Sequence, residues 1–247
     1  MSTYVQLAQD MRRQAGLSGS GPADVATATG MELRLANAIR DAYTRIQTSP
    51  KSWKWMWREY IPESLGTAPL QTIQDTTDYL LEDCEQIWTN TFRCYLTTTG
   101  TTDMQSIRYL DFERFQERFS LVTATSDRPI MVTRLPTGAL RFYPPPNAAY
   151  SILFECQKEP QILAANDDVP EMPSQYHPLI TFEALKAWGK SEDAPEIVKL
   201  AEEEGGSEGG EGRQGGATGI WRQLIWSQEM KRANDPAENP QMVVRTV

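Results

Sequence analysis

Apolar residues follow two different periods along this chain, a helical period toward both ends and an alternating period in the middle. Near the N-terminus, one helical face carries Val5, Ala8, Met11 and Ala15. That helix should end at Gly16, before the loop sequence SGSGP. A longer helix is predicted over residues 29–47. Its apolar face consists of Met31, Leu35, Ala38, Ile39, Ala42, Tyr43 and Ile46. Each apolar face needs a packing partner, so these two helices should pack on each other.

Helical spacing returns toward the C-terminus. In residues 176–190, Pro178 lies near the helix start, where its missing N–H costs nothing. The apolar face of this helix carries Leu179, Phe182, Leu185 and Trp188. Two more helices are predicted over residues 195–204 and 219–232. Between them, residues 205–216 read GGSEGGEGRQGG, and a stretch without apolar side chains predicts a flexible loop.

The middle of the chain carries strand signals, which are sharpest over residues 130–157. Two short strands, 130–135 and 139–143, flank the turn sequence PTG, and a strand with two different faces spans residues 150–157. The prolines at 144–146 should form a rigid corner before that last strand, because proline lacks the N–H that a ladder needs. These residues predict a three-stranded antiparallel meander.

A second hairpin is predicted earlier in the same region, from residues 85–100 and 104–112, with its tip at TTTGTTD. The sequence FERFQERF follows it. There Phe112, Phe115 and Phe119 recur at helical spacing, which predicts a short helix.

Three tryptophans form a row in the sequence WKWMWREY. Trp53, Trp55 and Trp57 lie two residues apart, which would place them on one side of a strand. Such a row could stack on sugars or bases, but alternating aromatic residues more often pack in a core or an interface. We therefore interpret the row as core or interface.

The order of helices, strands and helices predicts an α+β fold, in which an antiparallel β insertion interrupts a helical body. The expected body comprises residues 1–58 and 174–233, and the expected β insertion comprises residues 59–173. Residues 205–216 form the flexible loop, and residues 234–247 form an extended C-terminal tail.

Composition narrows the class of protein. The net charge is −9, which disfavours a protein that holds nucleic acid, because such binding draws on clustered Lys and Arg. No apolar run could span a bilayer and the N-terminal pattern is amphipathic, so neither membrane insertion nor export is expected. The cysteines Cys84, Cys94 and Cys156 are widely spaced, and we expect reduced, buried thiols.

The sequence offers few candidates for catalysis or metal binding. His177 is the only histidine, and at a helix start it should cap or pack rather than act as a base. The carboxylates Asp167, Asp168 and Glu171 could hold calcium or form an acid–base pair, but the glycine and terminal glutamate of an EF-hand are missing, which favours a solvated loop. The sequence GLSGSGP lacks the lysine of a phosphate loop. We expect no enzyme, no cofactor and no metal.

Five segments occur together in one order: LAQDMRRQAGLSGSGP, WKWMW, IRYLDFERF, RPIMVTRLPTGALRFYPPPNAAYSILFECQKEPQIL and VPEMPSQYHPLITFEAL. In this order and spacing they resemble the head-to-tail adaptor, or connector, proteins of tailed bacteriophages. The resemblance covers most of the chain. It leaves out the last residues and GGSEGGEGRQGG, where that family would have one continuous helix.

The resemblance implies a structural virion protein that forms a homo-oligomeric ring, typically a dodecamer, beneath the portal. It implies two protein partners, the portal protein and a tail protein of the nozzle or tube. Double-stranded DNA would pass through the lumen without specific binding, and no membrane is involved. The implied location is the head–tail junction of the virion, after assembly in the host cytoplasm.

The C-terminal tail contains Met242, Val243 and Val244, an apolar and β-prone run with no evident place in the subunit's own core. We interpret this run as a contact with the portal or a neighbouring subunit. A frayed terminus is the alternative.

Two other functions stay open. A virion-associated polysaccharide-binding or depolymerising protein would use the tryptophan row and a pair of carboxylates. A cytosolic regulator that binds nucleic acid would need a basic face, for which the chain offers the pairs Arg12–Arg13 and Lys231–Arg232.

Overall fold

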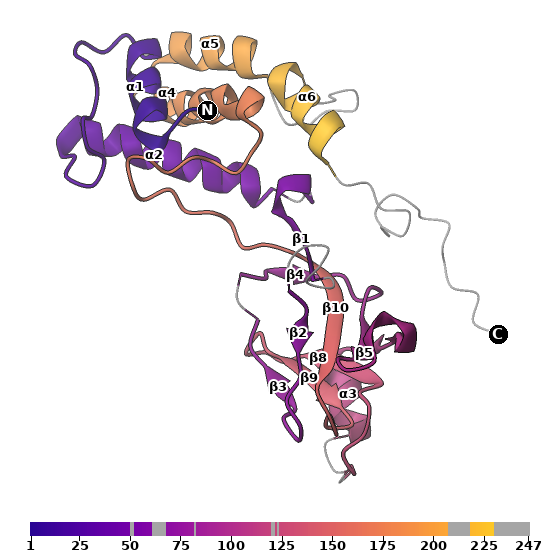
Figure 1. Cartoon of the computed structure of the whole chain (residues 1–247). Helices are drawn as coiled ribbons and strands as arrows, with labels where there is room; N and C mark the ends of the chain where they lie inside the picture. Colours follow the sequence, from indigo (N-terminus) through magenta and orange to yellow (C-terminus); the bar gives the residue numbers. More distant parts are fainter. Residues whose placement is uncertain are drawn as a thin grey trace. The chain divides into compact units, whose positions relative to one another are not determined.

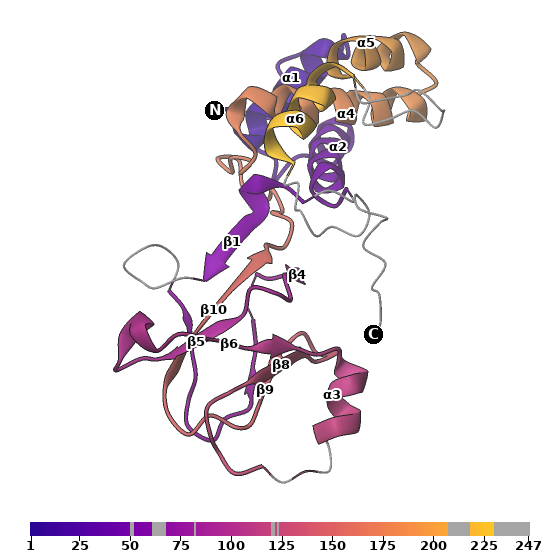
Figure 2. The ribbon, with the colours of Figure 1, turned by 90° about the vertical axis from the view of Figure 1, so that its right-hand side faces the viewer.

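The computed structural model describes residues 1–49, 52–60, 68–81, 83–119, 122, 124–206 and 218–229. They form an α+β fold, as the sequence predicts. The chain folds into two compact units (Figure 1, Figure 2). The helical unit comprises Met1–Met56 and Pro160–Val247, and the β unit comprises Trp57–Glu159.

The described part of the helical unit contains helices α1 (Tyr4–Gln14), α2 (Gly30–Gln47), α4 (His177–Ser191), α5 (Pro195–Gly205) and α6 (Gly219–Gln228). Helix α4 is central, since it packs on α1, α2 and α5 (Figure 1). The short 3-10 turn η1 (Lys54–Met56) ends the first segment of this unit. A second 3-10 turn, η3 (Ser174–Tyr176), leads directly into α4. Each helix lies where the apolar periodicity predicts it, with ends that differ by a few residues.

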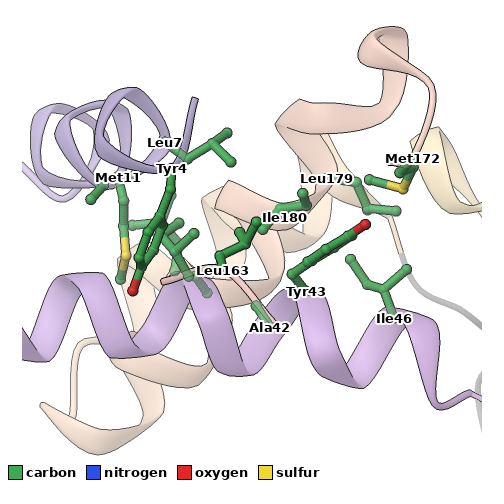
Figure 3. Packing of buried hydrophobic residues seen from close by; sticks show 14 of the residues in the cluster. Tyr4, Leu7, Met11, Ala42, Tyr43, Ile46, Leu163, Met172, Leu179 and Ile180 are labelled. Atoms are coloured by element: carbon green, nitrogen blue, oxygen red, sulfur yellow. The ribbon is translucent and has the colours of Figure 1, made fainter. Parts of the chain in front are cut away.

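The buried face of α1 differs from the predicted one. Its buried residues are Tyr4, Leu7, Ala8 and Met11, whereas Val5 and Ala15 are only half-buried. The Tyr4 hydroxyl donates a hydrogen bond to the carbonyl of Ala36 on α2 (2.8 Å), so the aromatic ring enters the core. Figure 3 shows Tyr4 and Met11 directed toward α2, where they meet the core that also includes Ala42 and Ile180.

Residues 160–173 correct the expected domain boundary, because they belong to the helical unit and not to the β insertion. Leu163 is fully buried in the helical core (Figure 3). Gln161 exchanges two hydrogen bonds with the side chain of Gln47 on α2, at 2.8 and 3.0 Å. The backbone carbonyl of Asp168 accepts from Tyr4 N–H at 2.8 Å. Several backbone groups of this segment therefore bond to α1 and α2 instead of a sheet.

The described part of the β unit contains two sheets. In the first, the strand order is β1-β10-β5-β6, and β2 and β4 also pair with β10. Its strands are β1 (Trp57–Tyr60), β2 (Leu70–Gln71), β4 (Gln86–Ile87), β5 (Arg93–Leu96), β6 (Gln105–Ser106) and β10 (Tyr150–Gln157). The second sheet has the order β3-β9-β8-β7. Its strands are β3 (Asp78–Tyr79), β7 (Arg108–Tyr109), β8 (Met131–Arg134) and β9 (Leu140–Tyr143). Helix α3 (Phe112–Phe119) and the 3-10 turn η2 (Gly100–Asp103) complete the unit.

The predicted three-stranded meander is wrong in its third strand. Strands β8 and β9 form the expected antiparallel hairpin, with Met131 opposite Tyr143. Strand β10, however, lies in the other sheet, between β1 and β5. The prolines after Tyr143 cannot donate to a ladder, so the chain leaves the sheet of β8 and β9 there and does not turn back onto it. Because β10 is central, nearly all of its residues are buried, and its two faces do not differ as predicted.

The second predicted hairpin is correct only in its first half. Strands β5 and β6 pair antiparallel, with Arg93 opposite Ser106 and η2 within the tip. Strand β7 follows at once but pairs parallel with β8, with Arg108 opposite Met131. Residues 104–112 therefore contribute one strand to each sheet, β6 to the first and β7 to the second. Helix α3 forms as predicted, with Phe115 buried.

Candidate assembly surfaces

The three tryptophans predicted to form one row do not lie on a strand together. Residues 54–56 form the turn η1, which sends successive side chains in different directions. Trp53 is fully buried in the helical core and donates its indole N–H to the carbonyl of Ile46 (2.9 Å). Trp55 stacks on it with ring centroids 4.8 Å apart. Trp57 begins β1, is 37% exposed, and bonds to Glu155 at 3.2 Å. Trp53 and Trp55 therefore pack in and against the helical core.

Helix α6 carries the most exposed tryptophan of the described residues. One side of the helix is anchored, because Trp221 and Leu224 are buried in the helical core. Lys54 donates to the carbonyl of Ser227 at 2.5 Å, and the Ser227 hydroxyl bonds to Tyr176 at 2.5 Å. Trp226 projects from this anchored helix and is 83% exposed. A large exposed aromatic residue on a fixed helix is typical of a protein–protein contact.

The sequence analysis does not single out Trp226, although the helical period indicates that its side chain is exposed. In the helix predicted over residues 219–232, the helical period places on one side Ile220, Trp221, Leu224, Ile225 and Gln228. Trp226 lies outside that set, so the periodicity that identifies the buried face also marks this tryptophan as exposed.

The β unit contains a pocket between helix α3 and strand β9, with a cavity volume of about 310 Å³. Its walls include Phe112, Phe115, Phe119 and Tyr143, and the Phe119 and Tyr143 rings stack with centroids 4.0 Å apart. Arg141 also lines the pocket and forms a two-point ion pair with Asp78, at 2.6 and 2.5 Å. The hydrogen bonds from Arg141 hold the pKa of Asp78 below its usual value. This pocket offers apolar walls and one charged edge, a composition that suits a side chain of a partner protein.

His177 is a structural residue in this fold. Its side chain is buried, its Nε2 bonds to the carbonyl of Met172 (2.9 Å), and its Nδ1 accepts from the N–H of Ser2 (3.2 Å). Because Nδ1 accepts, the ring is neutral with its proton on Nε2, and burial lowers the pKa of His177. The imidazole joins the N-terminal segment to the start of α4.

The carboxylates of the NDDVPEMP segment do not converge on one point. Asp168 accepts from the backbone N–H groups of Ala164 and Ala165, at 2.6 and 2.7 Å, and so closes a local turn. Within the described residues, no group of three or more His, Cys, Asp and Glu side chains could hold a metal ion. The helices among them are also all too short or too polar to cross a membrane.

Two sequence-predicted features lie wholly or largely outside the described residues. The tail residues Met242, Val243 and Val244 are outside them, as are residues 207–217 of the Gly/Glu-rich stretch. The two ends of that stretch are described, however. Gly206 and Thr218 lie so close that a Cβ added to Gly206 would stand 2.0 Å from the Thr218 carbonyl oxygen. The chain therefore leaves α5 and enters α6 at nearly the same point.

The sequence matches the family described as SU10 adaptor protein over residues 2–208, which include the whole β unit and most of the helical unit. No curated protein matches the chain. An adaptor works by binding other proteins, and the candidate sites described above are surfaces that suit protein contacts. The chain therefore belongs to the SU10 adaptor protein family and is a phage structural protein of the adaptor type.

Proposed function

We propose that this protein forms a homo-oligomeric ring beneath the portal, where it joins capsid to tail and extends the DNA channel. The observation that carries the proposal is the match to the adaptor family over residues 2–208. Its partners would be the portal protein and a tail protein of the nozzle or tube, and the ring would be a dodecamer. The protein would be assembled in the host cytoplasm and reside at the head–tail junction of the virion.

The organisation of the helical unit supports this role. Each subunit of a ring must present two complementary surfaces, one to each neighbour, which requires a body whose helices do not shift. Helix α4 packs on α1, α2 and α5 and accepts a hydrogen bond from Trp221 of α6. Its residues Leu179, Ile180 and Leu185 are fully buried. The anchored helix α6 then holds Trp226 in a defined position on the surface. We assign Trp226 to a subunit or portal contact.

The charge of the chain supports passage of DNA through the ring without specific binding. The net charge is −9, and a phosphate backbone is repelled by carboxylates. A channel with such walls would let DNA slide.

The C-terminal tail supplies a second proposed contact. Met242, Val243 and Val244 follow two prolines, and an apolar run of this kind can add a strand to a partner or fill its groove. We assign these residues to the portal or to the neighbouring subunit.

Electron microscopy of the purified protein mixed with candidate portal rings tests the proposal. We expect a ring of this protein on one face of the portal, and a portal-dependent gain of mass in mass photometry. A stable dimer that ignores portals would contradict the ring.

Two variants then locate the contacts. A chain lacking residues 234–247 should fold normally by circular dichroism but fail to join portal rings, and unchanged binding would exclude the tail as a contact. Trp226→Ser should keep the fold but weaken assembly by about tenfold or more, because exposed tryptophans at interfaces commonly contribute over about 1.4 kcal/mol. The matched control is Ile73→Ser, since Ile73 is also an exposed apolar residue but lies in the β unit.

A further inference from the structure

Two of the three cysteines meet inside the β unit although they are far apart in the sequence. Cys84 precedes strand β4, and Cys156 lies in strand β10. Both belong to the same apolar cluster, with exposed fractions of 2% and 0%. Their thiols are hydrogen-bonded to each other. Two thiols in contact are a chemically distinct arrangement, because either sulfur can attack a disulfide formed on the other.

The backbone around the two thiols holds them together. Strand β4 pairs with β10 so that Ile87 lies opposite Cys156, and the N–H of Glu85 donates to the carbonyl of Gln157 at 2.9 Å. The guanidinium of Arg134 donates to the carbonyl of Cys84 at 2.8 Å. Cys84 is therefore tied to both β10 and β8.

The cover over Cys84 is thin. The flanking residues Asp83 and Glu85 are half-buried and exposed, respectively. Asp83 forms an ion pair with Arg58 at 3.2 Å, and surface pairs of this kind contribute little to stability. Strand β4 is also only two residues long. A local opening of this segment would expose Cys84 while the two sheets stay folded.

The two thiols are not equivalent. The hydrogen bond from Cys156, together with Arg134 and Arg58, holds the pKa of Cys84 below its usual value despite burial. The same hydrogen bond and burial raise the pKa of Cys156. Cys84 is therefore the thiol that ionises first and acts as the nucleophile.

We propose that Cys84 and Cys156 are a redox-active dithiol that closes into an intramolecular disulfide on reaction with a low-molecular-weight disulfide such as oxidised glutathione. The Cys84 thiolate attacks one sulfur of the reagent, forms a mixed disulfide and releases one glutathione thiolate. The Cys156 sulfur then attacks Cys84, closes the protein disulfide and releases the second glutathione thiolate. The two protein protons pass to the released thiolates, so the protein loses two electrons and the reagent gains them.

The dithiol would respond to the change of compartment that a phage particle experiences. Glutathione in the host cytoplasm keeps thiols reduced, whereas the medium outside a lysed cell allows disulfides to persist. The subunit would fold and assemble with free thiols and gain a cross-link afterwards. This consequence rests on the proposed function, but the chemistry of the dithiol does not.

Cys94 provides an internal control. It is also buried, but its sulfur contacts the guanidinium Nε of Arg128 (3.5 Å) and the carbonyl of Pro129 (3.7 Å) instead of another thiol. Burial raises the pKa of Cys94. This thiol should stay reduced under conditions in which the other two react.

The test uses the full chain, incubated without portal in buffers of increasing ratio of oxidised to reduced glutathione, quenched with an alkylating reagent and mapped without reduction. We expect one cross-linked pair of peptides that contains Cys84 and Cys156, with Cys94 alkylated. Cys94→Ser should form the same cross-link. Cys84→Ser and Cys156→Ser should form none, and Cys156→Ser should accumulate glutathione on Cys84. Closure should raise the Tm of the wild type by about 5 °C.

Three outcomes would overturn the proposal. They are a cross-link that involves Cys94, stable glutathionylation of the wild type without closure, and the absence of any reaction across the whole series. Each can be read on the isolated protein, so a failure of the dithiol is distinguishable from a failure of the ring proposal.

Discussion

The helical unit and the β unit are stabilised by different kinds of interaction. The helical unit has long helices with apolar faces, and its core contains many fully buried aliphatic residues. The β unit has several strands of only two residues, which leave loop carbonyls without ladder partners. Arginine side chains donate hydrogen bonds to these carbonyls instead. Arg128 binds both oxygens of Asp103 (2.9 Å) and the carbonyl of Cys94 (3.0 Å), and Arg134 binds the carbonyls of Cys84 and Glu85.

This difference shows how short strands can be held without a long ladder. A planar guanidinium offers five N–H donors in fixed directions, so one side chain can satisfy several carbonyls from separate loops. Apolar truncation should therefore be most damaging in the helical unit, and loss of an arginine should be most damaging in the β unit.

The largest effect is expected from Leu179→Ala in α4. Leu179 is fully buried, and removal of its side chain should lower the free energy of unfolding by about 3 kcal/mol. Chemical denaturation gives the magnitude, and hydrogen exchange should show the loss of protection in the helical unit. Leu200→Ala on α5 is the matched control, since Leu200 is 41% exposed. Equal losses for the two variants would contradict the central position of α4.

The next largest effect is expected from Arg128→Ala. The change leaves Asp103 and the carbonyl of Cys94 without their donor, at a cost of about 2 kcal/mol. Arg128→Lys should not restore the loss, because an ammonium group cannot bind both Asp103 oxygens and that carbonyl in the same way. Protection should fall in the β unit alone. Arg118→Ala, which changes an exposed residue of α3, is the control. A full rescue by lysine would show that charge alone matters here.

Gly189→Ala should have a smaller effect, in the helical unit. A Cβ at Gly189 would stand 2.9 Å from the Cγ2 of Val198 on α5. Overpacking of about 2 kcal/mol is partly offset by the better helix propensity of alanine, so we expect a net loss of about 1 kcal/mol in denaturant titrations. The double variant Gly189→Ala with Val198→Ala should remove the shortest contact of this Cβ, the one with Cγ2, and so recover part of the loss. A double variant less stable than the sum of the two single changes would mean that the helices do not approach closely at this point.

The pH dependence of stability should show the contribution of His177. Burial lowers the pKa of His177 below 6.5, so the unfolded chain binds a proton at a higher pH than the folded chain does. The contribution of His177 to the free energy of unfolding should be fully present above about pH 6.5. It should fall as the pH drops below that value, with a slope of at most about 1.4 kcal/mol per pH unit. Most carboxylates titrate only at lower pH. Unfolding curves between pH 7.5 and 5.5 measure the slope. His177→Gln should flatten it, and an unchanged slope would assign the effect elsewhere.

The smallest effect is expected from replacing residues 207–217 by two glycines. Gly206 and Thr218 already lie in contact, so a short connection can close the chain, and the entropy of loop closure varies only weakly with length. Stability should change by less than about 0.5 kcal/mol in the same titrations. Gly206→Ala is the contrasting variant. It should be strongly destabilising, because Gly206 has a φ of 81° and its Cβ would overlap the Thr218 carbonyl. A large loss on shortening would mean that the helical unit depends on those residues.

The sequence predicted the helical unit better than the β unit, for a physical reason. A helix is specified by contacts three and four residues apart, so the spacing of Leu179, Leu185 and Trp188 was enough to place α4. A sheet is specified by pairing between distant residues. Nothing in the alternation of residues 150–157 distinguishes pairing with β9 from pairing with β1 and β5.

The sequence predicts some of the candidate surfaces better than others. The strand expected over Trp53, Trp55 and Trp57 does not form, because alternation in three residues is also compatible with a 3-10 turn. The pocket under α3 could not be predicted, since it depends on how Phe119 meets Tyr143 on a strand elsewhere in the chain. The exposure of Trp226 can be predicted from the helical period alone, once the buried face of α6 is assigned.

The pairing of β1 with β10 has a consequence for how such proteins diverge. Trp57, where the chain enters the β unit, lies opposite Gln157, near the point where the chain leaves it. Cα atoms of residues directly opposite in an antiparallel pair are only about 4.5–5.5 Å apart. A gene could therefore lose, gain or exchange everything between these two positions as one cassette, and a few residues would suffice to reconnect the helical body. Inheritance can then act on the two units separately, and a change in the cassette need not disturb the helical body.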